Sequence, residues 1–443
     1  MSMLFLLIAF GVIFYLILWQ KWSTTAASVA ASFVLIVLDG IPIWNGLQQT
    51  YAAGLGSSTG NYFFLLCFGA LFGHFMSASG CALKIARVLT NLLGKKNVTV
   101  TLFTLTALMV YGGISVLVVV FTVGPVGLAM MREANLPRRH LAACILAGGS
   151  TLSMTSLPGI PNLLNLMPTG YLGTDAMAAP VIGIIGSIIQ YILCVLFLLF
   201  IEKRYISKGM GFEENVATSI VQKEDDFGDL PKGFMAFLPT LILICSVLFL
   251  SRVLTGGSTP AAVLGSTVAC IVIYLTNRKR FKKRLGDTIT EGMQGGLNAA
   301  INMAAMVGFG VVIQSSSAFV IITDFVTGLS SGGGVVSVLL SLFVAVSIFV
   351  ATTASAGSGL DIFWKTMGDR FISTGVNPQL LHRISCMAAG GFDTVPHNSA
   401  YPVFNSVLGT ETKEVYPLVA VLTLTIPVIS CIICIFLAGM GLV

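Results

Sequence analysis

The feature that most constrains this chain is a series of long apolar runs interrupted by very few charges. Only 9% of the 443 residues are charged, whereas an ordinary soluble domain carries about 25%. Most of the runs approach the roughly 20 residues that a helix needs to cross a bilayer. They cover residues 3–19, 24–41, 62–75, 180–201, 234–250, 261–275 and 418–442. The pattern predicts an all-α polytopic membrane protein. The first run lacks a basic start and a small-residue cleavage site, so we interpret it as a retained helix.

The basic residues and the cysteines do not indicate a site of their own. The formal net charge is +6, but lysine and arginine lie at the ends of the apolar runs and form no single patch, so no nucleic-acid partner is expected. The nine cysteines lie mostly inside apolar runs, which favours small buried hydrophobes over zinc or redox chemistry. We therefore expect no metal and no cofactor beyond a coupling ion.

The two halves of the chain are similar at an offset of roughly 240 residues, as is typical of secondary transporters. LPRRHLAACILAGG at 136–149 matches NPQLLHRISCMAAGG at 377–391. Further matched segments are 68–80 with 308–318, 98–131 with 335–367, and 157–162 with 394–399. The shared order of these segments predicts an internal repeat.

Each half is predicted to hold four continuous spans, one broken helix and one re-entrant hairpin that enters and leaves on the same side. Five crossings per half is an odd number, so the two repeats must be inverted. The expected organisation is a first repeat at 1–201 (hairpin 98–131, broken helix 139–168), a linker at 202–233, and a second repeat at 234–443 (hairpin 335–371, broken helix 379–409).

The distribution of basic residues favours this inverted arrangement. Lysine and arginine collect in short cytoplasmic loops. The inverted arrangement places all but four of the 24 basic residues on one side, the exceptions being Arg252, Lys365, Arg370 and Arg383. We expect both termini outside, the linker 202–233 in the cytoplasm, and the chain in a bacterial-type inner membrane.

Residues 388–402, AAGGFDTVPHNSAYP, place an acid, a histidine, an asparagine and two prolines in apolar surroundings. Irregular backbone and ionisable groups at membrane depth are tolerated where they face protein or water, so the stretch predicts a functional site. Asp393 and His397 are four residues apart and would share a helical face, which makes them candidates for carrying a coupling proton. Alternatively, Asp393 caps the next helical segment and His397 bonds a freed carbonyl.

The hairpin tips and helix breaks supply the other candidates. Glycine and hydroxyl side chains at the tips, and Pro and Gly at the breaks, expose helix ends and backbone groups that suit an anion. The predicted substrate-binding residues are Gly113, Ser115, Pro161, Asn162, Thr353, Ser355, Gly357, Ser358, His397, Asn398 and Ser399. The alternative is that small residues at the tips only permit tight helix packing.

Other polar residues inside the apolar runs are weaker candidates. His74 is expected on a Gly-rich face opposite Gln314. Asp361, like Asp39 and Asp324, is expected near an interface or hairpin limb where solvent satisfies it. No lysine or arginine is expected at the centre, so a bound anion would rely on amides, hydroxyls and helix ends.

GGFDTVPHNSA at 390–400 resembles the Leu-Asp-Thr/Ser-Leu-Pro-His-Asn-Gly-Ala run of the gluconate permease (GntP) family of the ion transporter superfamily. TASAGSG at 353–359 and residues 112–139 are similar to further family segments, and the resemblance covers essentially the whole chain. It implies a proton-coupled symporter of small hydroxy-carboxylates, whose members handle gluconate, related sugar acids, 3-hydroxybutyrate or D-serine. It also implies a homodimer in which a transport domain moves against a fixed scaffold, as in an elevator.

Departures from the family pattern bear on the substrate. Phe392 stands where Leu is usual, Ser399 replaces Gly, and 115–121 is rich in valine instead of the Pro-Leu-Phe-Phe-Glu type. Loss of that glutamate argues against a polyol acid. The chain is thus more similar to the 3-hydroxybutyrate permease branch, and a short monocarboxylate is expected. Gluconate, another sugar acid and a small amino acid such as D-serine remain alternatives.

Coupling to sodium and two other protein classes are the remaining alternatives. Hydroxyls and carbonyls at 151–156 and 352–358 are hard oxygen ligands that would also suit sodium. A channel would need a continuous polar lumen. An intramembrane enzyme is not expected, because the chain has no H-E-x-x-H or Walker motif and AGSG at 356–359 lacks the first glycine of G-x-S-G.

Overall fold

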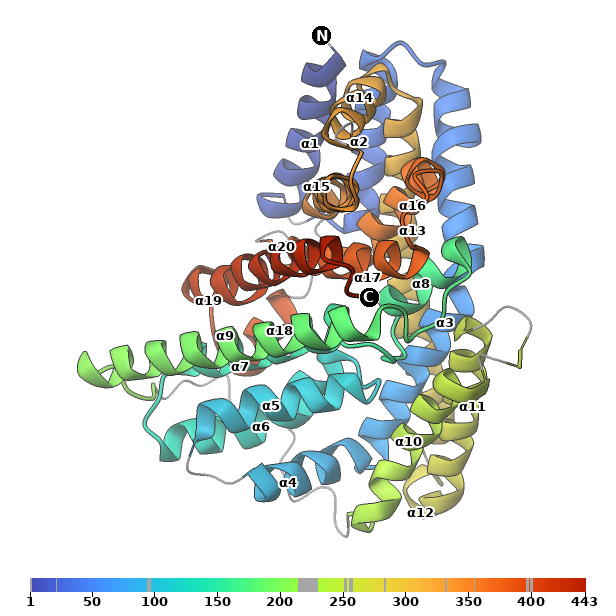
Figure 1. The fold of residues 1–443 in the computed structure, drawn as a ribbon. Helices are drawn as coiled ribbons and strands as arrows, with labels where there is room; N and C mark the ends of the chain where they lie inside the picture. The colour runs from blue at the N-terminus through green and yellow to red at the C-terminus, as the bar shows by residue number, and fades with distance from the viewer. Residues whose placement is uncertain are drawn as a thin grey trace.

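The fold is built from helices throughout the part of the chain that the structure describes (Figure 1). The structure is a computed structural model that describes residues 2–20, 22–93, 97–213, 230–250, 253–254, 258–282, 284–330, 333–353, 355–395, 398 and 401–443. The predicted all-α class is confirmed. His397, Ser399 and residues 214–229 of the predicted linker lie outside the described residues.

The two halves carry the same order of elements. The first half contains α1 (Ser2–Leu18), α2 (Thr24–Leu38), η1 (Asn45–Tyr51), α3 (Ala52–Ala78), α4 (Cys81–Leu93), α5 (Val98–Tyr111), α6 (Val116–Glu133), α7 (Arg138–Ser150), η2 (Leu152–Ser156), α8 (Leu163–Leu172) and α9 (Pro180–Ser207). The second contains α10 (Gly233–Phe249), α11 (Ser258–Thr276), α12 (Arg278–Phe281), α13 (Leu285–Ser315), α14 (Ser317–Ser330), α15 (Val335–Thr353), α16 (Ala356–Ile372), α17 (Pro378–Ala389), α18 (Tyr401–Leu408), α19 (Thr412–Val419), η6 (Ala420–Thr425) and α20 (Ile426–Gly439). Each half begins with a pair of helices, which is followed by a long helix and then a shorter one. Next come two helices joined by a tight turn, two short helices on either side of a break, and a final long helix.

Local sequence signals explain where several of these helices begin and end. Asn162 caps α8, its side chain accepting from the backbone N–H of Asn165, and Gly173 ends the helix in the left-handed conformation with φ of +63°. Pro180 opens α9 at a position where its missing N–H costs nothing. Gly113 turns the chain between α5 and α6 with φ of +83°, which residues with a Cβ rarely adopt.

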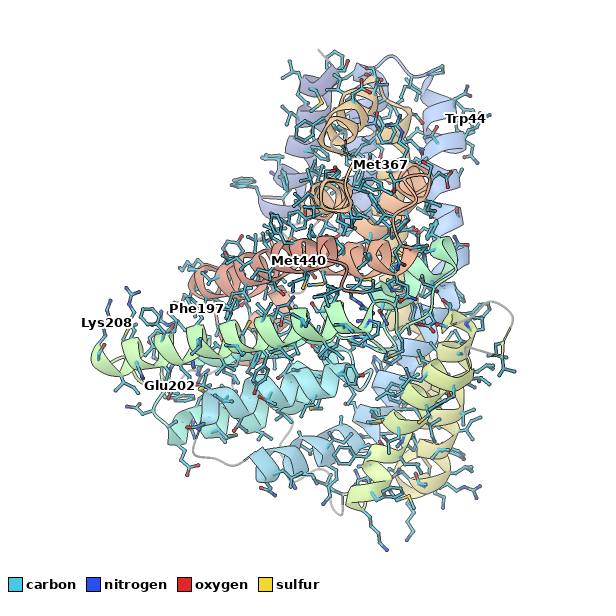
Figure 2. The ribbon with its side chains drawn as sticks, viewed as in Figure 1. Trp44, Phe197, Glu202, Lys208, Met367 and Met440 are labelled. Atoms are coloured by element: carbon cyan, nitrogen blue, oxygen red, sulfur yellow. The ribbon has the colours of Figure 1, made fainter. Side chains whose placement is uncertain are left out.

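Five helical stretches in the described ranges are long and apolar enough to cross a membrane. They are Asn45–Ala78, Pro180–Ser207, Ser258–Thr276, Leu285–Ser315 and Thr412–Gly439. Along α9 one exposed stripe is entirely apolar, and it consists of Val181, Ile184, Ile188, Ile192, Leu196 and Phe200. The charged Glu202 and Lys208 follow at the end of the helix (Figure 2). An exposed apolar stripe that ends in charges is typical of a lipid-facing helix.

A close antiparallel pair, α3 and α13, runs through the molecule. A Cβ on Gly54 would lie 3.2 Å from Gly308 Cα, and a Cβ on Gly296 would lie 2.3 Å from Cys67 Cα. The start of α3 therefore meets the end of α13, and glycines let the two backbones approach. In Figure 1, α3 runs up the view with α10 and α11, while α5, α6 and α9 lie across it.

The buried apolar side chains form two large clusters. The first contains α4 to α7 with α18, α19 and parts of α3, α9, α10 and α11. The second contains α1, α2, α8, α13 to α17 and α20. Each broken helix runs from one cluster into the other. In the first broken helix, α7 lies in the first cluster and α8 in the second. In the other broken helix, α17 lies in the second cluster and α18 in the first. The two breaks therefore lie at the boundary of the clusters.

Candidate functional site

The first break, between α7 and α8, touches the second break, between α17 and α18, at the boundary of the two apolar clusters. A Cβ on Gly390, just after α17, would lie 2.6 Å from Thr155 Cγ2 in η2. Thr155 is fully buried, and its hydroxyl donates to the carbonyl of Thr151 at 3.1 Å. The missing side chain of Gly390 is thus what allows the two broken helices to cross.

The first break also contacts both hairpin tips. A Cβ on Gly113, in the turn between α5 and α6, would lie 3.4 Å from Pro161 Cγ. A Cβ on Gly357, at the start of α16, would lie 3.0 Å from Leu163 Cδ2. Residues 155–163 therefore contact three other segments, namely the two hairpins and the second break.

Side-chain hydrogen bonds hold the first break in shape. Asn162 Oδ1 accepts from the backbone N–H of Asn165 at 2.9 Å, and Asn162 Nδ2 donates to the carbonyl of Met154 at 2.7 Å. Asn162 thus bridges the two sides of the break. Ser115, which immediately precedes α6, is exposed. The assignment of Ser115, Pro161 and Asn162 to substrate binding stays a prediction.

The second hairpin tip is a compact group of hydroxyls. Ser355 Oγ accepts from the backbone N–H of Ser358 at 3.3 Å and so caps α16. Ser358 Oγ lies 3.0 Å from Ser355 Oγ and donates to the carbonyl of Met303 at 3.4 Å. Thr353 Oγ1 donates to the carbonyl of Phe349 at 2.9 Å. These hydroxyls mark the N-terminal end of α16, a position that suits a negatively charged group.

The second break contains a buried acid. Asp393 is 6% exposed, and its Oδ1 has no hydrogen-bond partner among the described residues. Asn398 Nδ2 donates to the carbonyl of Asp393 at 2.6 Å, and the Tyr401 hydroxyl donates to the carbonyl of Thr394 at 2.7 Å. A buried carboxyl oxygen is costly unless a donor, a proton or a ligand satisfies it. Because His397 lies outside the described residues, its pairing with Asp393 stays a prediction.

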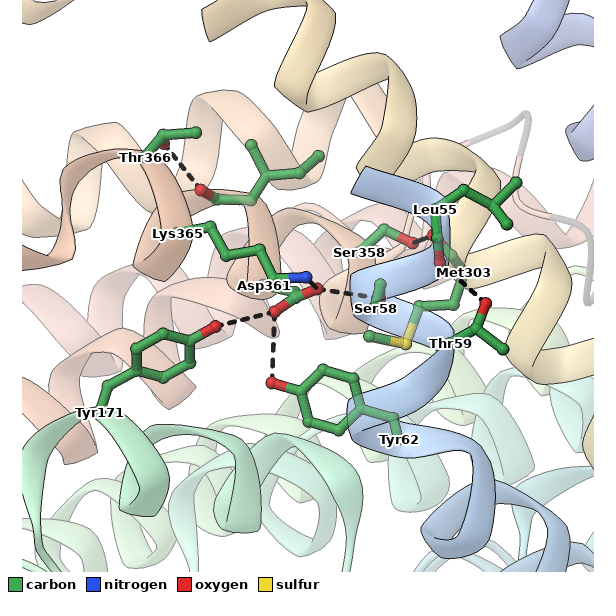
Figure 3. A network of polar contacts seen from close by, with 11 residues as sticks. Leu55, Ser58, Thr59, Tyr62, Tyr171, Met303, Ser358, Asp361, Lys365 and Thr366 are labelled. Atoms are coloured by element: carbon green, nitrogen blue, oxygen red, sulfur yellow. Dashed lines mark hydrogen bonds and ion pairs between the residues drawn. The ribbon is translucent and has the colours of Figure 1, made fainter. Parts of the chain in front are cut away.

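One polar cluster was missed by the sequence reasoning. Asp361 is fully buried and accepts four hydrogen bonds, from Ser58, Tyr62, Tyr171 and Lys365 (Figure 3). The expectation that solvent satisfies Asp361 is wrong, because donors on α3 and α8 surround it. The sequence contains a signal for this burial, because Asp361 and Lys365 are opposite charges four residues apart in an apolar helix.

Arg383, one of the four exceptions to the one-sided distribution of basic residues, is a second buried charge. Its guanidinium is fully buried and donates to Asn165 Oδ1 at 2.9 Å and to the carbonyls of Ala176 at 3.3 Å and Ala178 at 2.9 Å. The expectation of no lysine or arginine at the centre is therefore also wrong. Arg383 joins α17 to α8 and to the loop before α9.

The arrangement of α3 and α13 also changes the surroundings of His74. This side chain packs against Gly292 and Gly295 near the start of α13. It does not face Gln314, which is exposed near the other end of that helix. The reason is that α3 and α13 are antiparallel, so the end of α3 that carries His74 meets the start of α13 and not the end that carries Gln314.

Comparison with known proteins decides the family. The family model of GntP family permeases matches residues 1–440. The chain belongs to the GntP permease family. It is a multi-pass membrane permease and not an enzyme.

Relatives of this permease are similar over nearly their whole length. It is 26% identical to the uncharacterized transporter YxjC of Bacillus subtilis, with 96% of each chain covered. It is 22% identical to the high-affinity gluconate transporter of Escherichia coli, with 98% of each covered. The gluconate permease of Bacillus licheniformis is 23% identical over 79% of this chain and 82% of the relative. Two of these three relatives are named for gluconate transport.

The fold has a solved counterpart. The crystal structure of the Alcanivorax borkumensis YdaH transporter is similar with a TM-score of 0.58, at 13% identity, over 90% of both chains. At this identity the likeness concerns the fold alone, and it supports the helical arrangement described above.

Proposed function

We propose that this GntP permease is a secondary active transporter that symports a proton with a small hydroxy-monocarboxylate such as 3-hydroxybutyrate. The observation that supports the proposal most is the meeting of the first break with both hairpin tips and the second break. The N-terminal ends of α8 and α16 meet there through Leu163 and Gly357, and Gly390, three residues before the buried Asp393, contacts Thr155. Such a place suits an anion together with a proton.

The size of the substrate is inferred from the first hairpin. The relatives named for gluconate transport support an organic acid as the class of substrate. Residues 115–121 are rich in valine and contain no acid, which favours a short, less hydroxylated acid over gluconate. Gluconate, another sugar acid and D-serine are the competing substrates.

The transport movement is proposed to be of the elevator type, between two inverted repeats. The recurring order of elements and the antiparallel pairing of α3 with α13 support an inverted repeat. We propose a homodimer in a bacterial-type inner membrane, with both termini outside and residues 202–233 in the cytoplasm.

Uptake into proteoliposomes tests the substrate and the coupling ion together. Labelled 3-hydroxybutyrate is expected to accumulate when the lumen is alkaline relative to the bath, and to stop accumulating when an ionophore collapses the pH gradient. Excess unlabelled 3-hydroxybutyrate should compete better than gluconate or D-serine. Accumulation that follows a sodium gradient and not the pH gradient would show that the coupling ion is sodium and not the proton.

Variants of the second break test the proposed site. Asp393→Asn is expected to lose pH-driven accumulation, because the amide cannot carry the proton, and His397→Ala and Asn398→Ala should reduce it. Asp324→Asn is the matched control, since Asp324 is exposed on α14. If the three break variants transport like wild type, the site assignment is wrong.

A further inference from the structure

Arg383 is a fully buried positive charge to which no acid is bonded. Its guanidinium donates to Asn165 Oδ1 at 2.9 Å and to the carbonyls of Ala178 at 2.9 Å and Ala176 at 3.3 Å. These acceptors are neutral, and within the described residues no carboxylate, that of Asp393 included, is among its partners. A buried charge without a counter-charge is unfavourable, and neutral hydrogen bonds offset only part of that cost. The guanidinium therefore favours a negative charge in its surroundings.

The guanidinium lies close to the backbone of the first break. A Cβ on Gly183 of α9 would lie 3.2 Å from Arg383 Nε. The same Cβ would lie 2.7 Å from the carbonyl oxygen of Ser156 and 3.2 Å from Pro158 Cδ, both in the first break. A single methyl-sized position thus touches both the charge and the break. Because glycine occupies it, no side chain of α9 separates the two there.

Hydrogen bonds connect the same charge to the predicted substrate-binding residues of the first break. Asn165, whose Oδ1 accepts from Arg383, donates through Nδ2 to the carbonyl of Ile160 at 3.0 Å. The backbone N–H of Asn165 donates to Asn162 Oδ1 at 2.9 Å. Chains of hydrogen bonds polarise one another inside a protein. The charge of Arg383 therefore acts on the break through Asn165, without touching a ligand there.

We propose that Arg383 is a specificity-determining residue, whose charge makes the first break select a carboxylate over an uncharged compound. The inference rests on the proposed function and identifies the residue that sets its preference for anions. Charges inside a protein interact over several ångströms, because the effective dielectric constant is far below that of water. An arginine keeps its charge at every physiological pH. Amides and hydroxyls would then contact the substrate, while Arg383 supplies the balancing charge.

The electrostatic role of Arg383 can be separated from its role in holding helices together. The hydrogen bonds need the planar fork of a guanidinium, which lysine does not have. The electrostatic role needs only a positive charge at this place. Arg383→Lys therefore keeps the charge and loses the fork, whereas Arg383→Gln loses the charge and keeps an amide donor. A structural role predicts that both variants bind substrate poorly, but an electrostatic role predicts that only the glutamine variant does.

The central experiment compares a charged and an uncharged ligand in proteoliposomes that contain the full chain. Initial uptake of labelled 3-hydroxybutyrate gives the KM for the acid. Competition by unlabelled 3-hydroxybutyramide, in which an uncharged amide replaces the carboxylate, gives the inhibition constant of a neutral ligand of similar size. In Arg383→Gln the KM for the acid should rise by about tenfold, whereas the inhibition constant of the amide should change by less than about twofold.

Two further variants complete the comparison. Arg383→Lys should keep the KM for the acid close to the wild-type value, even though its melting temperature falls. Arg370→Gln is the matched control, because it removes the charge of an exposed arginine at the end of α16. It should change neither the KM for the acid nor the inhibition constant of the amide.

Each result either supports or overturns the inference. If folded Arg383→Gln loses acid and amide affinity equally, or if Arg383→Lys loses as much acid affinity as Arg383→Gln, the inference is wrong. Failure of the wild type to take up 3-hydroxybutyrate would instead overturn the proposed substrate. Labelled gluconate and unlabelled gluconamide then test the same variants, because the inference concerns the carboxylate that both acids carry. The two failures are therefore distinguishable.

An exposed acid tests the inference if the Arg383 variants do not fold. Asp175 lies in the loop that supplies the two carbonyls bonded to Arg383, and its exposed carboxylate accepts from the backbone N–H of Met177 at 2.8 Å. Its negative charge acts on the guanidinium and so opposes the positive charge at the break. Asp175→Asn should lower the KM for the acid by about twofold at low ionic strength and leave the amide unaffected. An unchanged or higher KM would overturn the inference.

Discussion

Arg383 shows how a single residue connects distant segments of this permease. Its planar guanidinium reaches Asn165 and two backbone carbonyls at once. Lysine cannot reproduce that geometry, because it has one nitrogen at the end of a flexible stem. The residue therefore acts as a rigid bracket between α17 and the segment around α8.

Substitution of Arg383 is expected to destabilise the fold. Arg383→Met would remove the donor to Asn165 Oδ1 and to the carbonyl of Ala178, at a cost of about 1–3 kcal/mol for each group left unsatisfied. The melting temperature in detergent should fall clearly, and Arg383→Lys should restore only part of the loss. Lys413→Met is the control, since that side chain is 78% exposed and exposed ion pairs contribute little. Equal melting of the Met variant and wild type would show that the bracket is dispensable.

The second hairpin, an element of two helices, depends on one close approach between its limbs. A Cβ on Gly359 of α16 would lie 2.5 Å from the backbone of Val350 on α15. Backbone atoms cannot rotate away as a side chain can, so the limbs would have to separate. The tip hydroxyls of Ser355 and Ser358 would move with them.

Gly359→Ala should therefore disturb the hairpin more than its small size suggests. Overpacking of this kind costs about 1–3 kcal/mol, and we expect a lower melting temperature together with weaker substrate affinity. Gly170→Ala on α8 is the matched control, because nothing lies within 4 Å of the added methyl group, and alanine favours a helix. Wild-type affinity in Gly359→Ala would indicate that the tip does not depend on the packing of the limbs.

The α3 and α13 pair sets the arrangement of the whole molecule, since it joins the two halves through glycine contacts. A Cβ on Gly296 would meet the backbone of Cys67 at 2.3 Å, whereas one on Gly60 would meet nothing within 4 Å. Both glycines lie in long helices, so they differ in packing and not in local conformation.

Gly296→Ala is expected to lower the yield of folded protein and its melting temperature, with a cost of about 1–3 kcal/mol from overpacking. Gly60→Ala should leave both unchanged or slightly raise stability. Size-exclusion profiles and thermal melts in detergent measure the comparison. Two variants that behave alike would show that the halves are not held together by this close approach.

The sequence by itself determined the elements of this protein. Apolar runs with few charges specify helices in a membrane, and Gly113, Pro161 and Asn162 leave local signals where the chain turns or breaks. These signals are readable because a missing N–H, a positive φ or a capping side chain acts on its own neighbours in the chain.

Only the tertiary structure decided which polar groups are buried and what they touch. The crossing of the breaks at Thr155 and Gly390 joins residues of different halves, and the donors to Asp361 come from α3 and α8. The sequence around Asp361 looks like a helix limb near an interface, since periodicity describes one helix and not its partners. The environment of a charge is a property of the packed helices around it, and for Asp361 and Arg383 those helices lie far away along the chain.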